Sequence, residues 1–433
     1  MPTAACGFDS RLSHFDNGAN PRDNTSAMPA PTNTADGDNR FHTSRLLGNG
    51  VILTKWGGAP PLSLAARMAR RFTLPRVSLA PVGAALQRPA LSGGLRITSR
   101  PSNVRVSTGG SPGHGVILVT GAAGFIGSHL SERLVAGGSR VVGVDNFCDF
   151  YDPTLKRRNL QSLLQSPRFT LIEADIRDGD RMDQVVREAR PSVIVHLAAM
   201  VGVRPSLEVP SLYASVNVGG TVSLLQAAAR HGVRRFVLAS SSSVYGNSRK
   251  VPFSEEDPVD HPISPYAATK RASELLGHAF AHVHGLSVIC LRYFTVFGPR
   301  QRPDLAIAKF MARMARGQEI PVFGDGSSSR DYTYVDDIVS GTMAAIQRPD
   351  PFRIYNLGGS SPVTLSTLVE TIERVTGLRA RIRRLPAQPG DVERTCADIA
   401  RAREELQYRP TVGLEEGIAR QWEWFRSSQG PGE

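Results

Sequence analysis

From Val116 onward, short runs of β-branched and other apolar residues alternate with segments long enough to form helices. Apolar runs of about four to eight residues, bounded by turn residues, are typical of strands that are buried on both faces. Helices between such strands act as crossovers and place the strands parallel to one another. The alternation therefore predicts an α/β fold with a doubly wound parallel sheet, whose expected strands are VILVT, RVVGVD, FTLIEA, SVIVHLA, RFVLAS and LSVICLRY.

The rhythm changes after residue 295, where shorter apolar units follow one another without a repeat. We interpret residues 296–427 as a smaller C-terminal α/β lobe that closes over the carboxyl edge of the sheet, and residues 116–295 as the first domain. The helix expected near 335–346 is an exception, since it could pack back on the first domain. The units are IPVF, YVDDIVSGTMAAIQ, RIYNLGG, LSTLVETIERVTG and LEEGIARQWEWF.

Residues 1–115 form a leader that is rich in Pro, Gly, Ser, Ala and Arg and has no sustained helical or strand period. Residues 41–115 contain ten Lys or Arg and no Asp or Glu, so most of the net charge of +12 belongs to the leader. We therefore expect a disordered basic leader and no nucleic-acid binding by the folded part. The composition resembles an organelle transit peptide, but a non-functional or mis-started extension is favoured, because the order of a signal peptide is missing.

No run of about eighteen apolar residues occurs in the sequence, so we expect no membrane span and a cytoplasmic protein. The four cysteines are far apart and form no CxxC pair, which argues against a zinc site and a disulfide framework and fits a reducing compartment. The histidines of HAFAHVH have no cysteine or acidic cluster beside them. We therefore expect no metal site.

The first expected strand runs directly into TGAAGFIGSHL, which places Gly121, Gly124 and Gly127 in the spacing GxxGxxG. Glycine suits the tight turn, the close approach of backbone to a pyrophosphate and the packing of helix on strand, while the helix N-terminus attracts the phosphates. Asp145 ends the second strand, where a carboxylate can hold a ribose 2′-hydroxyl and repel a 2′-phosphate. The pattern predicts a Rossmann-type domain over residues 116–295 that binds NAD rather than NADP.

The stretch SPYAATK places Tyr266 and Lys270 four residues apart at the start of an expected helix, and therefore on one helical face. A phenol ionises near pH ~10 in water, but a neighbouring ammonium and the positive ring of oxidised nicotinamide favour the phenolate. Tyr266 could then accept a proton from a substrate hydroxyl. The hydroxyls of Ser241 to Ser243 follow a strand that ends at the same sheet edge, and could hold the same oxygen.

Together these motifs resemble the extended short-chain dehydrogenases/reductases, the NAD-dependent epimerase/dehydratase family, across residues 116 to about 425. The resemblance is carried by TGAAGFIG, HLAA, ASSSSVYG, SPYAATK, RYFTVFGPRQRPD and SRDYTYVDDI. It implies a tightly held NAD, a nucleotide-sugar substrate in the C-terminal lobe, and a catalytic trio of Ser241, Tyr266 and Lys270. It implies cofactor contacts from Gly121, Gly124, Phe125, Ile126, Gly127, Asp145, Asn146, Asp175, Ile176, Ala198, Ala199, Asn217, Ser240, Tyr266, Lys270 and Tyr293. It implies substrate contacts from Arg204, Ser242, Ser243, Thr295, Arg302, Arg330 and Asp391.

Members of this family share an opening step, in which hydride leaves sugar C4 for NAD while the tyrosine takes the proton of the 4-hydroxyl. A dehydratase would resemble STDEVYG, with an Asp-Glu pair, and a decarboxylase would carry a Glu in that run, where this chain has serines. Without a second acid/base pair, the expected outcome is return of hydride to the opposite face, which is 4-epimerisation. The segments DNFCDFYDPTLKRRNL, GVRPSLEVP, FTVFGPRQRPD and QPGDVERTCADI resemble UDP-glucuronate 4-epimerases.

The expected reaction is conversion of UDP-glucuronate to UDP-galacturonate, with the serine run and Thr295 donating hydroxyls to the hexuronate carboxylate. A 4-epimerase of UDP-N-acetylglucosamine or UDP-glucose, and a non-catalytic NAD-binding protein, are the alternatives. Met200 and Pro205 stand where the family usually has Gln and an aromatic residue, which leaves the sugar less defined than the reaction. By analogy with the family we also expect a homodimer, paired through the helices that follow Ser211 and Tyr266.

Overall fold

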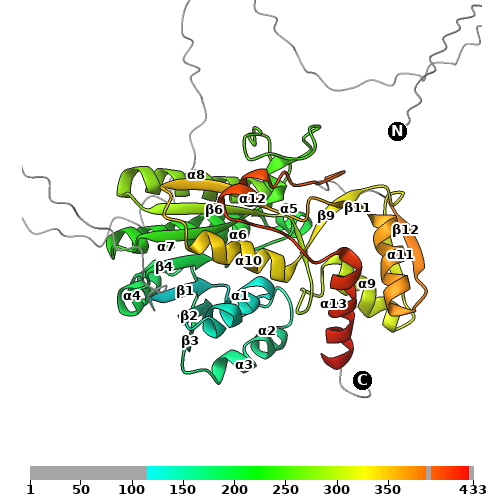
Figure 1. Cartoon of the computed structure of the whole chain (residues 1–433), viewed down its shortest axis with the longest axis horizontal. Helices are drawn as coiled ribbons and strands as arrows, with labels where there is room; N and C mark the ends of the chain where they lie inside the picture. The colour runs from blue at the N-terminus through cyan, green and yellow to red at the C-terminus, as the bar shows by residue number, and fades with distance from the viewer. Residues whose placement is uncertain (1–114, 387–391, 429–433) are drawn as a thin grey trace, which may run out of the picture. The chain divides into compact units, whose positions relative to one another are not determined.

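Seven strands form the main sheet of the chain, seen here in a computed structural model that describes residues 115–386 and 392–428 (Figure 1). The strand order is β10-β6-β5-β4-β1-β2-β3, and every neighbouring pair is parallel. The order reverses between β1 and β4, which is where ligands bind in sheets of this kind. The predicted doubly wound, Rossmann-type sheet is confirmed. Its strands are β1 (Val116–Thr120), β2 (Arg140–Asp145), β3 (Phe169–Glu173), β4 (Val193–His196), β5 (Arg235–Ser241), β6 (Ser287–Tyr293) and β10 (Phe352–Leu357).

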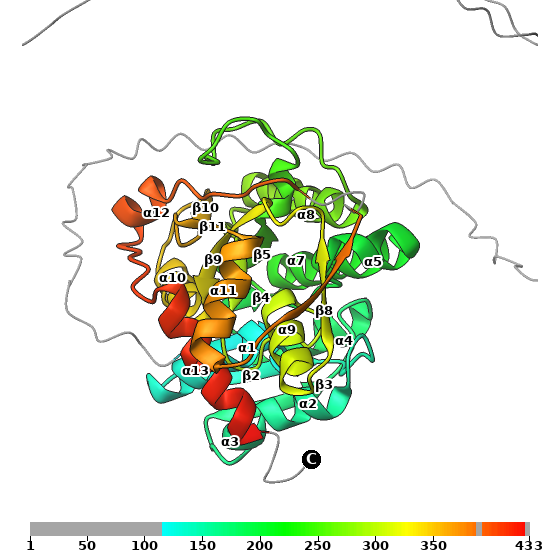
Figure 2. The ribbon, with the colours of Figure 1, turned by 90° about the vertical axis from the view of Figure 1, so that its right-hand side faces the viewer.

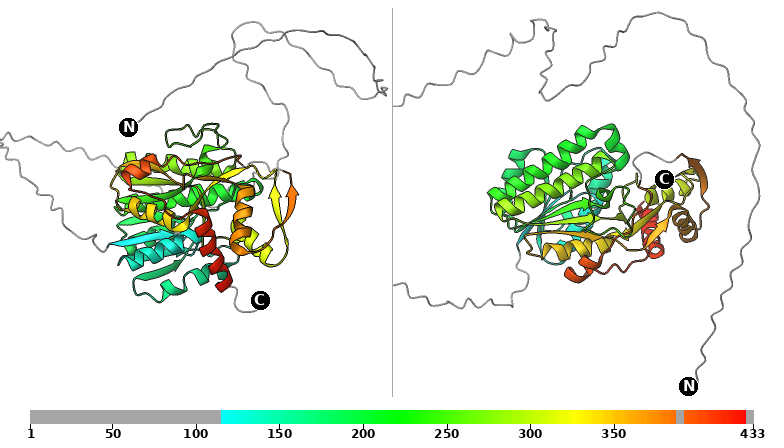
Figure 3. Two further views of the ribbon diagram at one scale, coloured as in Figure 1. Left: turned by 45° about the vertical axis from the view of Figure 1, so that its right-hand side comes forward. Right: turned by 90° about the horizontal axis from the view of Figure 1, so that it is seen from above.

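Helices cover both faces of the main sheet, as the right-hand view of Figure 3 shows. Neighbouring residues of one strand enter different cores: Leu118 packs with residues of α4, α7 and α8, whereas Val119 packs with residues of α1 and α10. Burial on both faces requires apolar runs without polar alternation, which is why the sequence revealed the strands. The helices before β10 are α1 (Phe125–Ala136), α2 (Pro153–Asn159), α3 (Gln161–Leu164), α4 (Gly179–Ala189), α5 (Val203–Glu208), α6 (Pro210–Tyr213), the π-helix η1 (Ala214–Gly219), α7 (Gly220–Arg230), the 3₁₀ helix η2 (Ser242–Tyr245), α8 (Pro265–His284), α9 (Ala306–Ala315) and α10 (Val335–Ile346).

Two smaller sheets lie in the C-terminal part of the chain, which Figure 2 turns toward the viewer. In the first, β9 (Ser329–Tyr334) lies between β7 (Thr295–Phe297) and β11 (Pro362–Thr364), and in the second β8 (Glu319–Phe323) pairs with β12 (Arg381–Leu385). The remaining helices are α11 (Leu365–Thr376), α12 (Ala400–Glu405) and α13 (Leu414–Ser428).

The assignment of RIYNLGG to the smaller lobe was wrong, because residues 352–357 form β10 and extend the main sheet beside β6. Helix α10 precedes this strand and lies against α1, so it acts as the crossover into the last position of the sheet. Residues 1–114 of the predicted leader and the predicted substrate residue Asp391, within 387–391, lie outside the described residues. In the ranges that are described, no helix has the length and apolar character needed to cross a membrane.

Candidate active site

The loop between β1 and α1 has the shape that the glycine spacing predicts. Gly121 has a φ of +71°, and its amide donates to the carbonyl of Val144 at 2.7 Å. A Cβ at Gly127 would lie 2.0 Å from the Gly121 carbonyl oxygen, so the close packing of helix on loop requires glycine there. Helix α1 begins after Gly124 with no side-chain cap and no acidic residue in its first turn. Its first amides therefore suit an anionic group, which fits the diphosphate of a dinucleotide.

The carboxyl ends of β2 and β3 bring three more of the predicted cofactor residues together. Asp145 is buried, and its two oxygens accept hydrogen bonds from main-chain amides at 3.0 and 2.9 Å. Burial raises the pKa of this carboxyl group, against the effect of the hydrogen bonds. Asn146 donates to Asp175 at 3.0 Å, and the hydrogen bond from Arg177 is the main cause that lowers the pKa of Asp175 to about 2. Each oxygen of Asp145 keeps a lone pair for a ribose hydroxyl.

Asn217 fixes the loop that carries Ala198 and Ala199. Its side chain accepts from the amide of Met200 at 2.8 Å and donates to the carbonyl of the same residue at 2.9 Å. It also donates to Thr269 at 3.0 Å. These bonds use both donors of the Asn217 amide and occupy its oxygen. The side chain of Asn217, which is expected to line the cofactor, therefore also holds the loop after β4 in place.

Behind this loop, His196 links β1 to α7 through a buried chain of hydrogen bonds that the sequence analysis did not predict. Thr221 donates its one proton to the carbonyl of Asn217, so it accepts from His196 Nε2 at 3.1 Å. Nδ1 of the neutral ring then accepts from Thr120 at 2.7 Å, and Thr120 in turn accepts from the amide of Ala198 at 3.3 Å. Burial lowers the pKa of His196 to about 3, so the ring is neutral and this order of donors satisfies every group.

The predicted trio comes together where β5 ends and α8 begins. Ser264 caps α8 by accepting from a first-turn amide at 3.2 Å, which places Tyr266 and Lys270 on the first two turns. Ser241, the last residue of β5, donates to Ser243 at 3.1 Å and lies near enough to Tyr266 to oppose the rise that burial causes in the pKa of its phenol. Lys270 is 6% exposed and donates to the carbonyl of Ala239 at 2.7 Å. The sequence order of serine run and YxxxK thus becomes one cluster in space.

Burial is the largest influence on the protonation of both Tyr266 and Lys270. Burial raises the pKa of the Tyr266 phenol, and the opposing effects come from Ser241 and from the charge of Arg302. Burial also lowers the pKa of Lys270 to about 8, which Glu274 partly opposes. In the chain by itself the phenol is therefore protonated at neutral pH.

A cavity of about 140 Å³ gathers four of the predicted substrate residues. They are Ser242 and Ser243 of η2, Thr295 of β7 and Arg330 of β9. The rest of its described lining is Val203, Ile263, Ser264, Val392 and Thr395, so hydroxyl groups and one guanidinium face the space, and this lining holds no carboxylate.

Two other predicted substrate residues lie outside that lining. Arg204 stands over the ring of Phe323 at 4.1 Å. Arg302 pairs with Asp304 at 2.6 Å and stands over the ring of Phe150 at 5.1 Å. The charge of Arg302 nevertheless acts on the Tyr266 phenol, so Arg302 belongs to the same neighbourhood.

Several predicted cofactor residues turn their side chains into the protein. Ser240 donates to Glu274 at 2.6 Å, and the phenol of Tyr293 donates to Thr342 of α10 at 2.9 Å. Ile176 is buried so closely against Gly220 that a Cβ there would lie 2.4 Å from it. The side chains of these residues thus have partners within the protein, and their contacts with the cofactor stay a prediction. Of the two residues after Gly124, Phe125 is buried in the core and Ile126 is half-buried.

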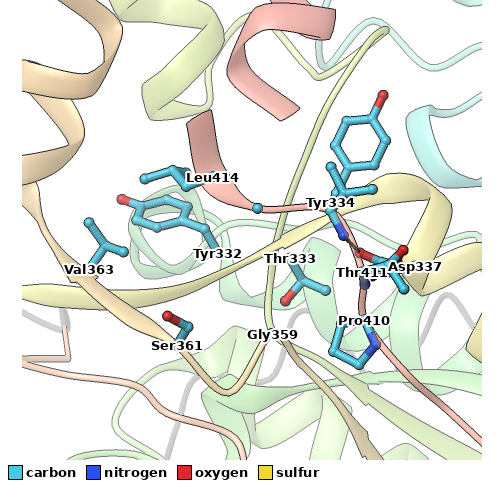
Figure 4. A pocket seen from close by; sticks show the side chains of 12 residues that line it. Tyr332, Thr333, Tyr334, Asp337, Gly359, Ser361, Val363, Pro410, Thr411 and Leu414 are labelled. Carbon is cyan, nitrogen blue, oxygen red and sulfur yellow. Dashed lines mark hydrogen bonds between the residues drawn. The ribbon is translucent and has the colours of Figure 1, made fainter. Parts of the chain in front are cut away.

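A larger cavity of about 210 Å³ lies elsewhere, between β9, the start of β11 and the segment before α13 (Figure 4). Asp337, Thr333 and Tyr332 line it, together with Thr411 and other residues of that segment. None of the predicted catalytic, cofactor or substrate residues is among its lining. The smaller cavity, which lies beside the trio, is therefore the candidate active site.

A sequence profile of the family described as "GDP-mannose 4,6 dehydratase" matches residues 118–421. The chain is an extended short-chain dehydrogenase/reductase. The resemblance read from its motifs is thereby confirmed. This extended short-chain dehydrogenase/reductase is 41% identical over 315 residues to the UDP-glucuronate 4-epimerase of Thermodesulfobacterium geofontis, over 72% of this chain and 97% of the relative.

The backbone is equally similar to solved structures of two enzymes that catalyse different reactions. The UDP-glucuronic acid 4-epimerase of Bacillus cereus, in complex with UDP-glucuronic acid and NAD, is 37% identical with a TM-score of 0.69, covering 72% of this chain and 99% of that one. The dTDP-glucose 4,6-dehydratase DesIV of Streptomyces venezuelae, with NAD bound, is 32% identical with a TM-score of 0.69, covering 73% and 98%. The backbone thus does not separate an epimerase from a dehydratase, and side chains must do so.

Proposed function

We propose that the chain is an NAD-dependent 4-epimerase that converts UDP-glucuronate to UDP-galacturonate through a 4-keto intermediate. The observation that supports it most is the cavity beside Ser241, Tyr266 and Lys270, whose described lining offers hydroxyls and Arg330 but no carboxylic acid. Dehydration needs a second acid/base pair. Ser242 and Ser243 occupy the two positions at which the dehydratase motif STDEVYG has Asp and Glu. Without that pair, elimination of water has no acid/base catalyst, and a ketone that keeps its carboxylate is reduced again.

The residues of the trio have separable roles in this proposal. Bound NAD would supply the oxidant for sugar C4 and, later, the reductant for the ketone. Tyr266 accepts the proton of the 4-hydroxyl and returns it, while Ser241 hydrogen bonds to the same oxygen and orients it. Because burial raises the pKa of Tyr266, the phenolate needs the positive nicotinamide ring close by, so proton transfer is coupled to the oxidised cofactor.

The cofactor would occupy the crevice where the order of the strands reverses. Gly121, Gly124 and Gly127 form the cradle for the diphosphate, and Asp145 would hold the adenosine ribose. Asn146, Asp175, Ala198 and Ala199 line the same edge of the sheet. Lys270 would hold the nicotinamide ribose, and Asn217 would act by fixing the loop after β4.

The hydroxyl groups in the cavity would select a hexuronate. Ser242, Ser243 and Thr295 can donate to the carboxylate without neutralising it, while Arg330 suits the diphosphate. A 4-keto hexuronate is a β-keto acid, which loses carbon dioxide readily. Hydrogen bonds that hold its carboxylate near the plane of the ketone would slow that loss, so the same donors would serve both selection and protection.

The apolar side chains on α5 and α8 support a homodimer. Leu275 and Val283 of α8 are 55% and 69% exposed, and Leu207 and Val209 at the end of α5 are also exposed. These helices are in contact with each other, so the four side chains can form one apolar surface. We expect a second copy to cover it, which sedimentation analysis of the wild type and of Val283→Glu would test.

A reducing, cytoplasmic location is favoured by the free thiols of Cys148, Cys290 and Cys396.

A product assay tests the function. The purified chain is supplied with UDP-glucuronate, UDP-glucose and UDP-N-acetylglucosamine in separate reactions without added NAD, and the sugars are followed by NMR. We expect UDP-galacturonate from the first reaction alone, and no product with Tyr266→Phe. Turnover of a neutral sugar, or a substantial yield of a UDP-pentose, would contradict the proposed binding of the carboxylate.

A further inference from the structure

Beneath the carboxyl edge of the main sheet, Glu274 of α8 and Arg292 of β6 form an almost completely buried ion pair. Their side chains are 0% and 1% exposed, and Arg292 donates from Nε and Nη2 to the two carboxylate oxygens, each at 2.9 Å. The desolvation of such a pair can cost more than its attraction returns. Stability is therefore a weak explanation for keeping two charges in this core.

Arg271 of the same helix also donates to Glu274 at 3.1 Å, and the other hydrogen bonds of the network reach three further elements. Ser240 of β5 donates to Glu274 at 2.6 Å. Arg292 donates from Nη1 to the hydroxyl of Tyr245 in η2 at 2.9 Å, and Tyr245 donates to Asn356 of β10 at 2.7 Å. One network thus connects α8 with β5, β6, β10 and η2.

Each of these elements carries a part of the candidate site. Ser240 precedes Ser241, and Glu274 lies one helical turn after Lys270 on the helix that also carries Tyr266. Tyr245 ends the helix η2, which carries two of the hydroxyls that line the cavity. The network therefore includes the chain neighbour of Ser241 and a residue one helical turn from Lys270, and Ser241 and Lys270 both belong to the predicted catalytic trio.

We propose that Glu274 and Arg292 are positioning residues that set the distance and orientation of Ser241 relative to Tyr266 and Lys270. A guanidinium and a carboxylate joined at two points fix rotation as well as distance, which apolar packing does not do. The network would hold α8 against the ends of the strands within the tolerance that proton transfer requires. This inference rests on the proposed epimerase function and names residues outside the cavity that the reaction needs.

The test replaces the pair by apolar groups in the full chain. Glu274→Leu with Arg292→Met removes both charges, so neither is left buried without a partner. The control is Glu132→Leu with Arg300→Met, a partly exposed pair whose two contacts are also 2.9 Å and which joins α1 to the segment after β7. We measure thermal unfolding, retained NAD, KM and kcat.

We expect the first double variant to fold, to retain NAD, and to keep KM within about twofold while kcat falls about 100-fold. The control should change thermal unfolding but leave kcat within about twofold. Arg292→Lys keeps the positive charge but cannot reproduce the fork, so it should lose kcat as well. A merely structural role would instead lower the folded fraction and leave kcat per folded molecule unchanged.

Two results separate the failure of this inference from the failure of the proposed function. If the wild type epimerises a UDP-sugar and kcat of the Glu274→Leu, Arg292→Met variant stays within about twofold, the positioning role is overturned. If the wild type turns over no UDP-sugar, the proposed function fails. The positioning role is then decided by crystal structures of the wild type and the double variant, in which an unchanged separation of Ser241 Oγ and Tyr266 Oη would overturn it.

Discussion

Gly127→Ala tests whether close backbone contact shapes the cofactor cradle. The new Cβ would lie 2.0 Å from the Gly121 carbonyl oxygen and 2.9 Å from its carbon, so α1 must move away from the loop by about 1 Å. Alanine gains about 1 kcal/mol over glycine inside a helix. Overpacking against rigid backbone costs about 1–3 kcal/mol and displaces the amides that face the diphosphate. We expect NAD to bind about 10-fold to 100-fold more weakly, since each 1.4 kcal/mol corresponds to about tenfold.

The assay measures the NAD that is retained by the purified chain, and then the Kd of the stripped chain by calorimetry. Gly124→Ala is an intermediate case, because its Cβ would lie 3.2 Å from the same oxygen. Gly413→Ala is the matched control, because its Cβ would meet nothing within 4 Å. The expected order of NAD affinity is Gly413→Ala, then Gly124→Ala, then Gly127→Ala. Equal retention of NAD by the first and the last would refute the reasoning.

Three further predictions follow from the same geometry. Burial lowers the pKa of His196 to about 3, so unfolding takes up a proton below pH ~6.5. Lowering the pH from 7 to 5 should therefore lower the free energy of unfolding by about 2 kcal/mol. Urea unfolding at both pH values should show this loss in the wild type and a smaller loss in His196→Gln. Lys270, with a pKa of about 8, loses its positive charge as the pH rises through that value, so kcat should fall on the alkaline side; a flat profile from pH 7 to 10 would argue against a need for that charge. Thr295→Val removes a neutral hydrogen-bond donor to the carboxylate, so KM for UDP-glucuronate should rise about 10-fold. An equal rise in KM for UDP-glucose would show that Thr295 does not bind the carboxylate.

The parts of the fold that could be predicted are those with a local signal. Strands buried on both faces require apolar runs, and Gly121 to Gly127 and SPYAATK each lie within one stretch of chain. Strand β10 was assigned to the wrong sheet because an edge strand is half-exposed, and its sequence RIYNL lacks the long apolar run of the inner strands. A helix followed by that strand did carry the crossover pattern, so the signal was present but weak.

Within the site, strand geometry explains why Ser240 and Ser241 have different partners. Successive strand residues point to opposite faces, so the hydroxyl of Ser240 bonds to Glu274 while that of Ser241 bonds to Ser243. Glu274 and Arg292 were missed because they lie on different elements and charged residues are seldom completely buried. A buried pair of this kind becomes visible only when tertiary structure brings the two together.

The place of β10 in the sheet has a consequence for how the chain is made. The ribosome completes β6 at residue 293, but its neighbour β10 begins at residue 352, after all of β7, β8 and β9. At about 5–20 residues per second, the open edge of β6 waits about 3–12 s for its partner. During that interval the nascent sheet presents an unpaired, apolar strand to other chains. Synthesis of the C-terminal part is therefore also the step that closes the nucleotide-binding sheet, and a chain released before residue 352 should aggregate.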